Sequence, residues 1–129
     1  MTDPITDMFN RIKNAEAVFN DSVEMPYSEV KMRIAEILKD NGFIIDCKKR
    51  GAKSSKVIKI DLKYEKQKPG ILGFKRIYKP GQRIYGQRHS IKRVKDGYGL
   101  AVVSTPRGLM TDQTARKAKL GGEIMIEVW

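Results

Sequence analysis

Residues 99–112 read Gly99-Leu100-Ala101-Val102-Val103-Ser104-Thr105-Pro106-Arg107-Gly108-Leu109-Met110-Thr111-Asp112. The apolar run over 99–104 predicts a buried strand, because short apolar runs that end at turn residues are typical of strands in a core. The polar residues 104–108 are expected to form a loop at the tip of this strand. Thr111 is placed to cap a helix that runs to about Leu120, and residues 123–129 supply a final strand.

The clearest break in the chain is the turn Lys79-Pro80-Gly81, since proline and glycine both favour turns. Before it we expect two helices and several strands, and after it mostly strands, with a short strand at 83–85 and a helical turn at 90–95. The sequence therefore predicts an α+β fold of two small subdomains. The N-terminal α/β subdomain spans 1–79, and the C-terminal, mostly β subdomain spans 80–129.

Two amphipathic helices are expected in the N-terminal subdomain. Asp3-Pro4 predicts the start of the first helix, and Ser28 is the expected N-cap of the second, which ends at Asn41-Gly42. Their apolar residues recur at helical spacing. They are Ile5, Met8, Phe9 and Ile12 in the first helix and Val30, Ile34, Ile37 and Leu38 in the second. Strands are expected at 23–26, 43–49, 57–64 and 73–78.

Positive charge is concentrated in the middle of the chain. Residues 48–95 contain 17 Lys or Arg against 2 Asp or Glu, whereas residues 1–47 have a net charge of −4 and residues 96–129 a net charge of zero. For a single lysine, a solvated surface is the better interpretation, but local ion pairing does not explain so one-sided an excess. The pattern favours a polyanionic partner, either nucleic acid or an anionic membrane. Tyr64, Phe74, Tyr78 and Tyr85 lie in this region and offer stacking surfaces for unpaired bases, with positions in the core as the alternative.

Catalytic and metal-binding patterns are nearly missing. Cys47 is the only cysteine and His89 the only histidine, they lie far apart in sequence, and nothing marks a third residue that would orient a Cys/His pair. One Cys and one His do not make a zinc site without carboxylate ligands, and no glycine-rich phosphate motif follows a strand. We predict a protein that is not an enzyme and needs no cofactor, with an enzyme that uses Cys47 or His89 as the less favoured alternative.

The same features indicate an intracellular location. A single cysteine excludes an intramolecular disulfide and fits a reducing compartment. No apolar run approaches the roughly 20 residues needed to span a bilayer, and the first residues lack the basic and apolar regions of a signal peptide. We expect a cytoplasmic protein with no membrane partner.

The loop at 104–108 combines two hydroxyls, a guanidinium and a glycine. These groups, together with backbone N–H groups, read bases and 2′-hydroxyls at close range. The alternative is an ordinary β-to-α loop, and the pair Gly121-Gly122 has a similar alternative as a helix C-cap. Considered with the charge of the middle region, the loop favours binding of folded RNA.

Many ordered segments resemble the bacterial ribosomal protein S-eight family. They are Asp3-Pro4-Ile5-Thr6-Asp7-Met8, Arg11-Ile12-Lys13-Asn14-Ala15, Ile34-Ala35-Glu36-Ile37-Leu38-Lys39, Gly42-Phe43-Ile44, Lys79-Pro80-Gly81, Arg83-Ile84-Tyr85, Gly99-Leu100-Ala101-Val102-Val103-Ser104-Thr105, Gly108, Met110-Thr111-Asp112, Ala115-Arg116 and Gly121-Gly122-Glu123. The likeness covers nearly the whole chain, in order and with matching spacing, and the ordered set is specific although no single motif decides it.

The resemblance implies a structural protein of the small ribosomal subunit with two α+β subdomains. It implies direct binding of the central domain of 16S ribosomal RNA, a role in assembly of the subunit platform, and contacts with neighbouring proteins such as those of the S-five family. Some bacterial members also repress translation of their own operon by binding a similar site in its mRNA, which makes that mRNA a further expected partner.

By the same likeness, the C-terminal half carries the main RNA site. The matching residues are Ser104, Thr105, Arg107 and Gly108 in the recognition loop, Tyr85 as an aromatic contact with Lys79 and Arg83 in the same segment, and Gly121, Gly122 and Glu123 in a nearby turn. A second, less specific RNA surface is expected on the first helix, at Pro4, Arg11 and Asn14, together with Lys31.

One residue departs from the family pattern within the recognition loop. Family members usually carry a second serine where this chain has Pro106. Because proline lacks both a hydroxyl and an N–H donor, any contact made through either group is lost at this position. Proline is also expected to stiffen the loop.

Overall fold

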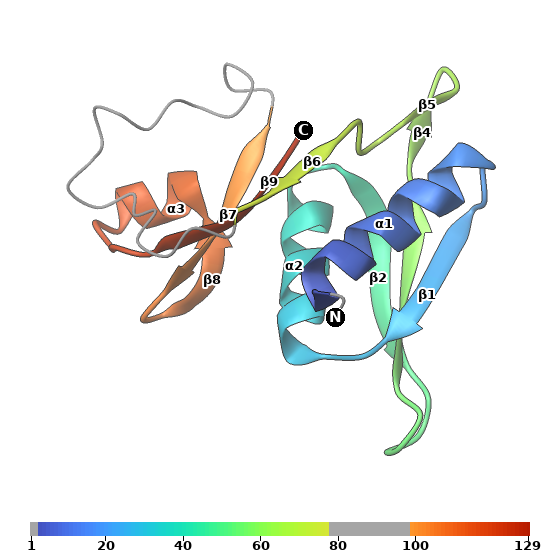
Figure 1. The fold of residues 1–129 in the computed structure, drawn as a ribbon, viewed down its shortest axis with the longest axis horizontal. Helices are drawn as coiled ribbons and strands as arrows, with labels where there is room; N and C mark the ends of the chain where they lie inside the picture. The colour runs from blue at the N-terminus through green and yellow to red at the C-terminus, as the bar shows by residue number, and fades with distance from the viewer. Residues whose placement is uncertain (1–2, 78–98) are drawn as a thin grey trace. The chain divides into compact units, whose positions relative to one another are not determined.

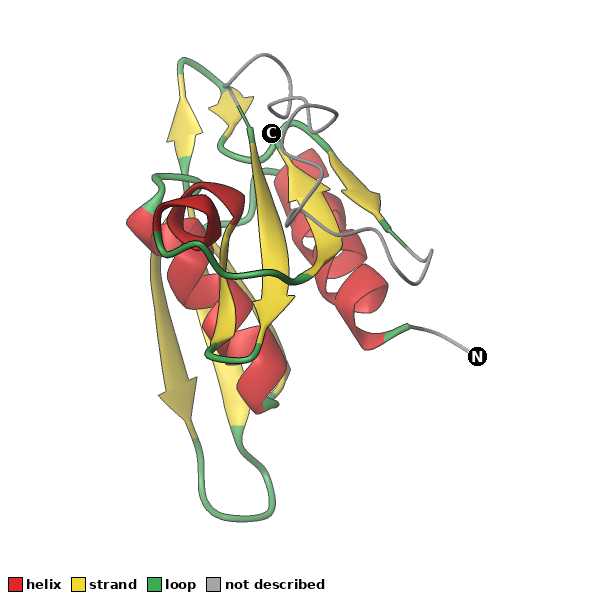
Figure 2. Cartoon of the chain, turned by 90° about the vertical axis from the view of Figure 1, so that its left-hand side faces the viewer, coloured by secondary structure: helices red, strands yellow, loops and turns green. Residues whose placement is uncertain are grey.

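The computed structural model describes residues 3–77 and 99–129, and the chain divides into two compact units, Met1–Leu72 and Gly73–Trp129. Both units combine helices with antiparallel strands, which confirms the α+β class (Figures 1 and 2). The predicted subdomain boundary at residue 80, the strand at 83–85 and the helical turn at 90–95 lie outside the described residues. Each unit is considered by itself below.

Both helices of the first unit begin where the sequence predicts, and the second also ends there. Helix α1 (Pro4–Ala17) starts at Asp3, whose carboxylate accepts hydrogen bonds from the Thr6 N–H at 3.0 Å and from the Thr6 hydroxyl at 2.8 Å. Helix α2 (Glu29–Asp40) starts at Ser28, and Gly42, with φ +79°, adopts the left-handed conformation just after its end. These are standard capping arrangements, in which a side-chain oxygen satisfies a free N–H and a glycine reverses the chain.

The first unit buries its helices against a three-stranded sheet. Strands β1 (Ser22–Pro26), β3 (Val57–Leu62) and β2 (Ile44–Arg50) lie in the order β1-β3-β2, all antiparallel. A separate small ribbon joins β4 (Tyr64–Glu65) to β5 (Lys68–Pro69). Buried and half-buried residues alternate along β3, so one face of the sheet packs on the core. Fully buried core residues include Met8, Phe9, Ile12, Ile34, Leu38, Ile58 and Ile60. Val30 of the predicted apolar face is instead 44% exposed.

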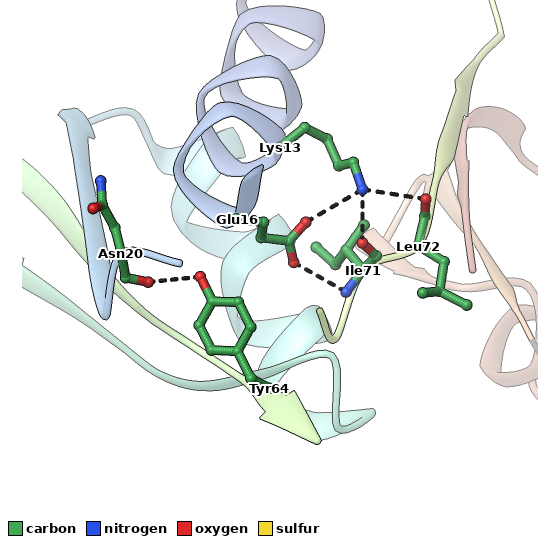
Figure 3. A network of polar contacts seen from close by, with 6 residues as sticks. All are labelled: Lys13, Glu16, Asn20, Tyr64, Ile71 and Leu72. Atoms are coloured by element: carbon green, nitrogen blue, oxygen red, sulfur yellow. Dashed lines mark hydrogen bonds and ion pairs between the residues drawn. The ribbon is translucent and has the colours of Figure 1, made fainter. Parts of the chain in front are cut away.

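A polar network holds the last residues of the first unit against α1 (Figure 3). The Glu16 carboxylate accepts a hydrogen bond from the Ile71 N–H at 3.2 Å, and Lys13 Nζ donates to the carbonyl oxygens of Ile71 at 3.0 Å and Leu72 at 3.2 Å. Lys13 Nζ also lies 3.4 Å from Glu16 Oε1. Burial raises the pKa of Glu16, an effect that the Ile71 hydrogen bond and the Lys13 charge partly offset. The network satisfies backbone groups in a segment that has no strand partner.

The second unit is a four-stranded antiparallel sheet with one short helix. Strands β6 (Phe74–Arg76), β9 (Glu123–Val128), β7 (Leu100–Thr105) and β8 (Gly108–Thr111) lie in the order β6-β9-β7-β8. Helix α3 (Asp112–Lys117) starts at Thr111, whose hydroxyl accepts a hydrogen bond from the Thr114 N–H, as the sequence predicts. The core contains Val102, Val103, Ala115, Ile126 and Val128, all 0% exposed.

Three details of this unit differ from the sequence prediction. Residues 108–111 form strand β8, so the loop at 104–108 is the turn of a β-hairpin and does not lead directly into the helix. Strand β6, which the sequence places in the N-terminal subdomain, pairs with β9. Helix α3 ends at Lys117, with Ala118 as its C-cap, and not near Leu120, because Lys119 takes the left-handed conformation with φ +56°. The C-cap interpretation of Gly121-Gly122 is therefore wrong.

Candidate nucleic-acid interface

The β7–β8 hairpin places the predicted recognition loop at its tip. Thr105 pairs with Gly108 across the hairpin, which leaves Pro106 and Arg107 as the two turn residues. Gly108 has φ +104°, whereas Pro106 and Arg107 do not have positive φ. This pattern is typical of a type I turn followed by a glycine in the left-handed region, and such a turn favours proline at its second position. Pro106 therefore suits the local backbone, although it brings neither hydroxyl nor N–H.

Thr105 closes this turn with its side chain. Its Oγ1 donates a hydrogen bond to the Gly108 carbonyl oxygen at 2.8 Å and accepts one from the Arg107 N–H at 3.1 Å. The hydroxyl proton is therefore used within the loop, and one acceptor site remains for a ligand. Thr105 holds the shape of the loop in addition to any contact that it makes.

Ser104 and Arg107 are the residues of the hairpin best placed to contact a ligand. Both are exposed, and within residues 3–77 and 99–129 neither the Ser104 hydroxyl nor the Arg107 guanidinium has a hydrogen-bond or ion-pair partner. A guanidinium offers five donors in a planar fork that matches phosphate oxygens and guanine edges. The tip thus presents one hydroxyl and one cation that are free to bind.

Gly122 and Glu123 lie directly beside the base of the hairpin. Glu123 pairs with Ser104 across β7 and β9, and Gly122 is buried against the same strand. A Cβ at Gly122 would lie 2.4 Å from the Ser104 carbonyl oxygen and 2.7 Å from Val103 Cγ1. Only glycine allows this approach, so the structure gathers Ser104, Thr105, Arg107, Gly108, Gly122 and Glu123 in one place, with Gly121 half-buried just before them.

The sequence reasoning missed a buried carboxylate that supports the hairpin. Asp112 Oδ1 accepts a hydrogen bond from the Ala101 N–H at 3.2 Å, and its Oδ2 pairs with Arg116 at 3.0 Å. Asp112 is 8% exposed, and it ties the start of α3 to strand β7. The only signal in the sequence is its position in the first turn of a helix, which acidic residues favour.

The predicted second surface lies on the first unit and is gathered only in part. Pro4, Arg11 and Asn14 are exposed, and spacings of seven and three residues place them on one face of α1. Arg11 Nε pairs with Asp7 Oδ2 at 3.0 Å. Lys31 is 8% exposed, and burial lowers its pKa, an effect that the charge of Asp7 opposes. Asp7 therefore partly compensates the charges of both Arg11 and Lys31.

Not all of the other candidate residues lie in the described part of the chain. Lys79, Arg83, Tyr85, Tyr78 and His89 lie outside the described residues. Tyr64 and Phe74 are half-buried, and the Tyr64 hydroxyl donates to the Asn20 carbonyl oxygen at 2.7 Å (Figure 3).

Burial raises the pKa of Cys47, and the nearby Glu36 and Asp46 carboxylates raise it further, so its thiol is a poor nucleophile. Among the described residues, no group of three or more His, Cys, Asp or Glu could hold a metal ion, and no helix is long and apolar enough to cross a membrane.

Comparison with known proteins agrees with the resemblance in the sequence. The family model described as "Ribosomal protein S8" matches residues 3–129. The protein "Small ribosomal subunit protein uS8" of Desulforamulus reducens is 47% identical over 130 residues, which cover 100% of this chain and 98% of the relative. Proteins with the same name from Kocuria rhizophila and Pelagibacter ubique are 44% and 45% identical, with 98% of each relative covered. The chain belongs to the ribosomal protein S8 family, whose members are structural, non-enzymatic proteins of the small ribosomal subunit.

Proposed function

We propose that this protein is a cytoplasmic component of the small ribosomal subunit that binds the central domain of 16S ribosomal RNA directly and supports assembly of the subunit platform. Membership of the family supports a ribosomal role, and the net charge of +11 favours a polyanionic partner. The choice of the central domain rests on the resemblance in sequence described above.

The observation that carries the proposal is the preformed tip of the β7–β8 hairpin. The Ser104 hydroxyl and the Arg107 guanidinium are exposed and have no hydrogen-bond or ion-pair partner in the described part of the chain, while Thr105 and Gly122 hold the backbone beneath them. A loop that is ordered before binding loses less conformational entropy when RNA binds, and a free guanidinium can select one base or phosphate geometry. We propose that Ser104, Thr105, Arg107 and Gly108 are the main RNA contacts, with Gly121, Gly122 and Glu123 beside them.

Two further groups of residues are assigned to the proposed interface only because of the resemblance in sequence to the S-eight family. Tyr85, Lys79 and Arg83 would contact the same RNA, with the Tyr85 ring available for stacking on an unpaired base. Pro4, Arg11, Asn14 and Lys31 would form the weaker second surface, where Asp7 reduces the attraction of Arg11 for phosphate. Contacts with neighbouring proteins such as the S-five family, and repression of the operon mRNA through the same hairpin, are proposed on the same basis.

The test is the affinity of the protein for a 16S central-domain fragment and for an unrelated RNA hairpin, measured at physiological salt. We expect the central-domain fragment to bind more tightly, and Arg107→Ala to weaken that binding by about 1–3 kcal/mol. Lys117→Ala, which removes another exposed cation from the same unit, is the matched control and should leave the preference intact. Equal affinity for the two RNAs would contradict the proposal.

Binding of the operon mRNA needs a separate test, because it uses the same surface as the ribosomal RNA. A reporter fused to the native leader should be repressed by the wild-type protein and less repressed by Arg107→Ala. Equal reporter expression with and without the protein would remove this regulatory role and leave the ribosomal one.

A further inference from the structure

The hairpin between β2 and β3 forms a basic arm, which we define as residues 48–56. It extends past the N-terminal end of α2 (Figure 1). Its five cations are all exposed: Lys48, Lys49, Arg50, Lys53 and Lys56. The arm belongs to the first unit, whereas the β7–β8 hairpin belongs to the second.

The charge of the arm is largely uncompensated. Residues 47–60 contain no Asp or Glu. Near the base, Lys48 lies 4.0 Å from Asp46 and Lys59 lies 3.9 Å from Asp61, which are long ion pairs between partly exposed side chains. Within the described ranges 3–77 and 99–129, Lys49, Arg50, Lys53 and Lys56 have no ion pair. Four cations thus remain available for a polyanion.

Local contacts fix the shape of the arm. The ammonium groups of Lys49 and Lys56 lie 5.2 Å and 5.9 Å from the centre of the Tyr27 ring, and the Tyr27 N–H donates to the Lys56 carbonyl oxygen at 3.1 Å. At the tip, Gly51 has φ +97°, and a Cβ there would lie 2.5 Å from the Ser55 carbonyl oxygen. The two ammonium groups repel each other, but each is attracted to the face of the Tyr27 ring. These cation–π contacts therefore hold both lysines beside Tyr27.

We propose that the basic arm binds the phosphate backbone of RNA, at a place separate from the β7–β8 hairpin. The inference rests on the proposed function, since it assigns a second contact with the same RNA. The arm has four lysines and one arginine, but no aromatic ring for stacking and no side-chain amide for reading a base. Such a set of side chains suits phosphate contacts, which position an RNA without reading its sequence.

Two other polyanionic partners fit the arm less well. Its tip carries Ala52, Ser54 and Ser55 and no large apolar side chain, so it has nothing to insert into a lipid bilayer. Protein interfaces are depleted of lysine and serine and enriched in aromatic residues. Residues 48–56 contain no aromatic residue, and the ring of Tyr27 beside them already contacts two lysines. The chemistry of the arm therefore matches RNA phosphates best.

The first test uses charge-matched double variants and the salt dependence of RNA binding. Arg50→Gln with Lys53→Gln removes two cations from the arm, and Lys66→Gln with Lys68→Gln removes two exposed cations from the β4–β5 ribbon. Each phosphate contact contributes about 0.7–0.9 to the slope of log affinity against log salt. We expect the arm variant to reduce this slope by about 1.4–1.8 and to bind the central-domain fragment at least about fivefold more weakly at physiological salt. The ribbon variant should change neither as much. Equal slopes for the two double variants would overturn the proposal.

The second test is cleavage of RNA by an iron chelate tethered to a single position. Ser54→Cys places the chelate on the arm, Pro106→Cys on the recognition hairpin, and Gln67→Cys on the β4–β5 ribbon. Cys47 is buried and its thiol pKa is raised, so the wild-type chain serves as the labelling control. In complexes with the central-domain fragment, chelates at positions 54 and 106 should cut different segments of the RNA, and the chelate at position 67 should cut weakly.

The outcomes separate the two proposals. If position 106 cuts the RNA and position 54 does not, the arm does not contact RNA and the proposed function stands. If neither position cuts the fragment, the proposed function itself fails, and the arm proposal fails with it. Crosslinking of position 54 to an acidic protein in assembled subunits, without cutting of RNA, would also overturn the inference.

Discussion

Gly122 approaches the backbone of Ser104 so closely that a Cβ at Gly122 would lie 2.4 Å from the Ser104 carbonyl oxygen. The contact joins the start of β9 to the last residues of β7, just before the chain turns at the tip of the hairpin. Because the obstructing atom belongs to the backbone, no rotation of a side chain can relieve a clash there. The position of the proposed recognition loop therefore depends on the absence of a side chain at residue 122.

Gly122→Ala is expected to destabilise the protein by about 1–3 kcal/mol, the usual range for forcing extra atoms into a packed site, and to weaken binding of the central-domain fragment. Chemical denaturation and RNA titration measure the two effects. Gly108 provides the contrast, since a Cβ there meets nothing within 4 Å and its constraint is φ +104°. Asn tolerates that conformation better than Ala, so Gly108→Asn should cost less than Gly108→Ala. If Gly122→Ala leaves both stability and RNA affinity unchanged, the close approach does not hold the hairpin.

Thr105→Val is expected to lower stability by about 1 kcal/mol, because it keeps the branched shape but removes both hydrogen bonds of Oγ1. Thr105→Ser retains the hydroxyl and should behave almost like the wild type. Denaturation midpoints and RNA affinity should therefore rank wild type and Ser above Val. A Val variant with wild-type affinity would show that the hydroxyl neither shapes the loop nor contacts RNA.

Lys119→Gly is expected to stabilise the protein by roughly 0.5–1 kcal/mol. Lys119 follows the end of α3 with φ +56°, a conformation that costs most residues other than glycine about 1–2 kcal/mol, and glycine recovers part of this because it also gains freedom in the unfolded chain. Lys117→Gly, at the last residue of the helix, where φ is not positive, is the control and should not stabilise the protein. Thermal denaturation measures both variants. A lower melting temperature for Lys119→Gly than for the wild type would contradict the left-handed conformation of Lys119.

Glu16 predicts a specific dependence of stability on pH. Its pKa in the folded protein is raised, mainly by burial, so the folded state holds the proton more tightly than the unfolded state. The contribution of Glu16 is therefore most favourable below its usual pKa and declines as pH rises from that value to the raised one. The free energy of unfolding of wild type relative to Glu16→Gln should fall across this interval and stay constant above it.

Denaturation series between about pH 4 and pH 7, which bracket the usual carboxyl range, would measure this difference. Gln can still accept the hydrogen bond from the Ile71 N–H. The ion pair with Lys13 requires the ionised carboxylate, so its contribution is part of the pH dependence that the comparison measures. Glu65→Gln removes another carboxylate paired with a lysine, but one whose side chain is 76% exposed. If both variants show the same pH dependence relative to the wild type, burial of Glu16 is not its cause.

Much of the fold could be predicted from short-range patterns. Asp3, Ser28 and Thr111 start helices as expected, because a cap depends on a hydrogen bond to an N–H only three residues away. In the strand predicted over 99–104, residues 100–103 are buried, as the apolar run indicates. For the candidate site, the sequence indicated the loop at 104–108 and its neighbours. The roles of these residues, like those of Tyr85, Lys79 and Arg83, stay predictions.

The sequence by itself determined the helix starts, the apolar stripes, the concentration of charge and membership of the family, since each depends on residue identity and near neighbours. Only the tertiary structure decided that β6 pairs with β9, that residues 108–111 return as a strand, and that Gly122 is a point of close approach and not a helix cap. Strand pairing joins residues that lie far apart in the chain, and no local propensity specifies the partner. The proposed recognition loop is therefore visible in the sequence, but the backbone contact that holds it appears only when β7 and β9 lie side by side.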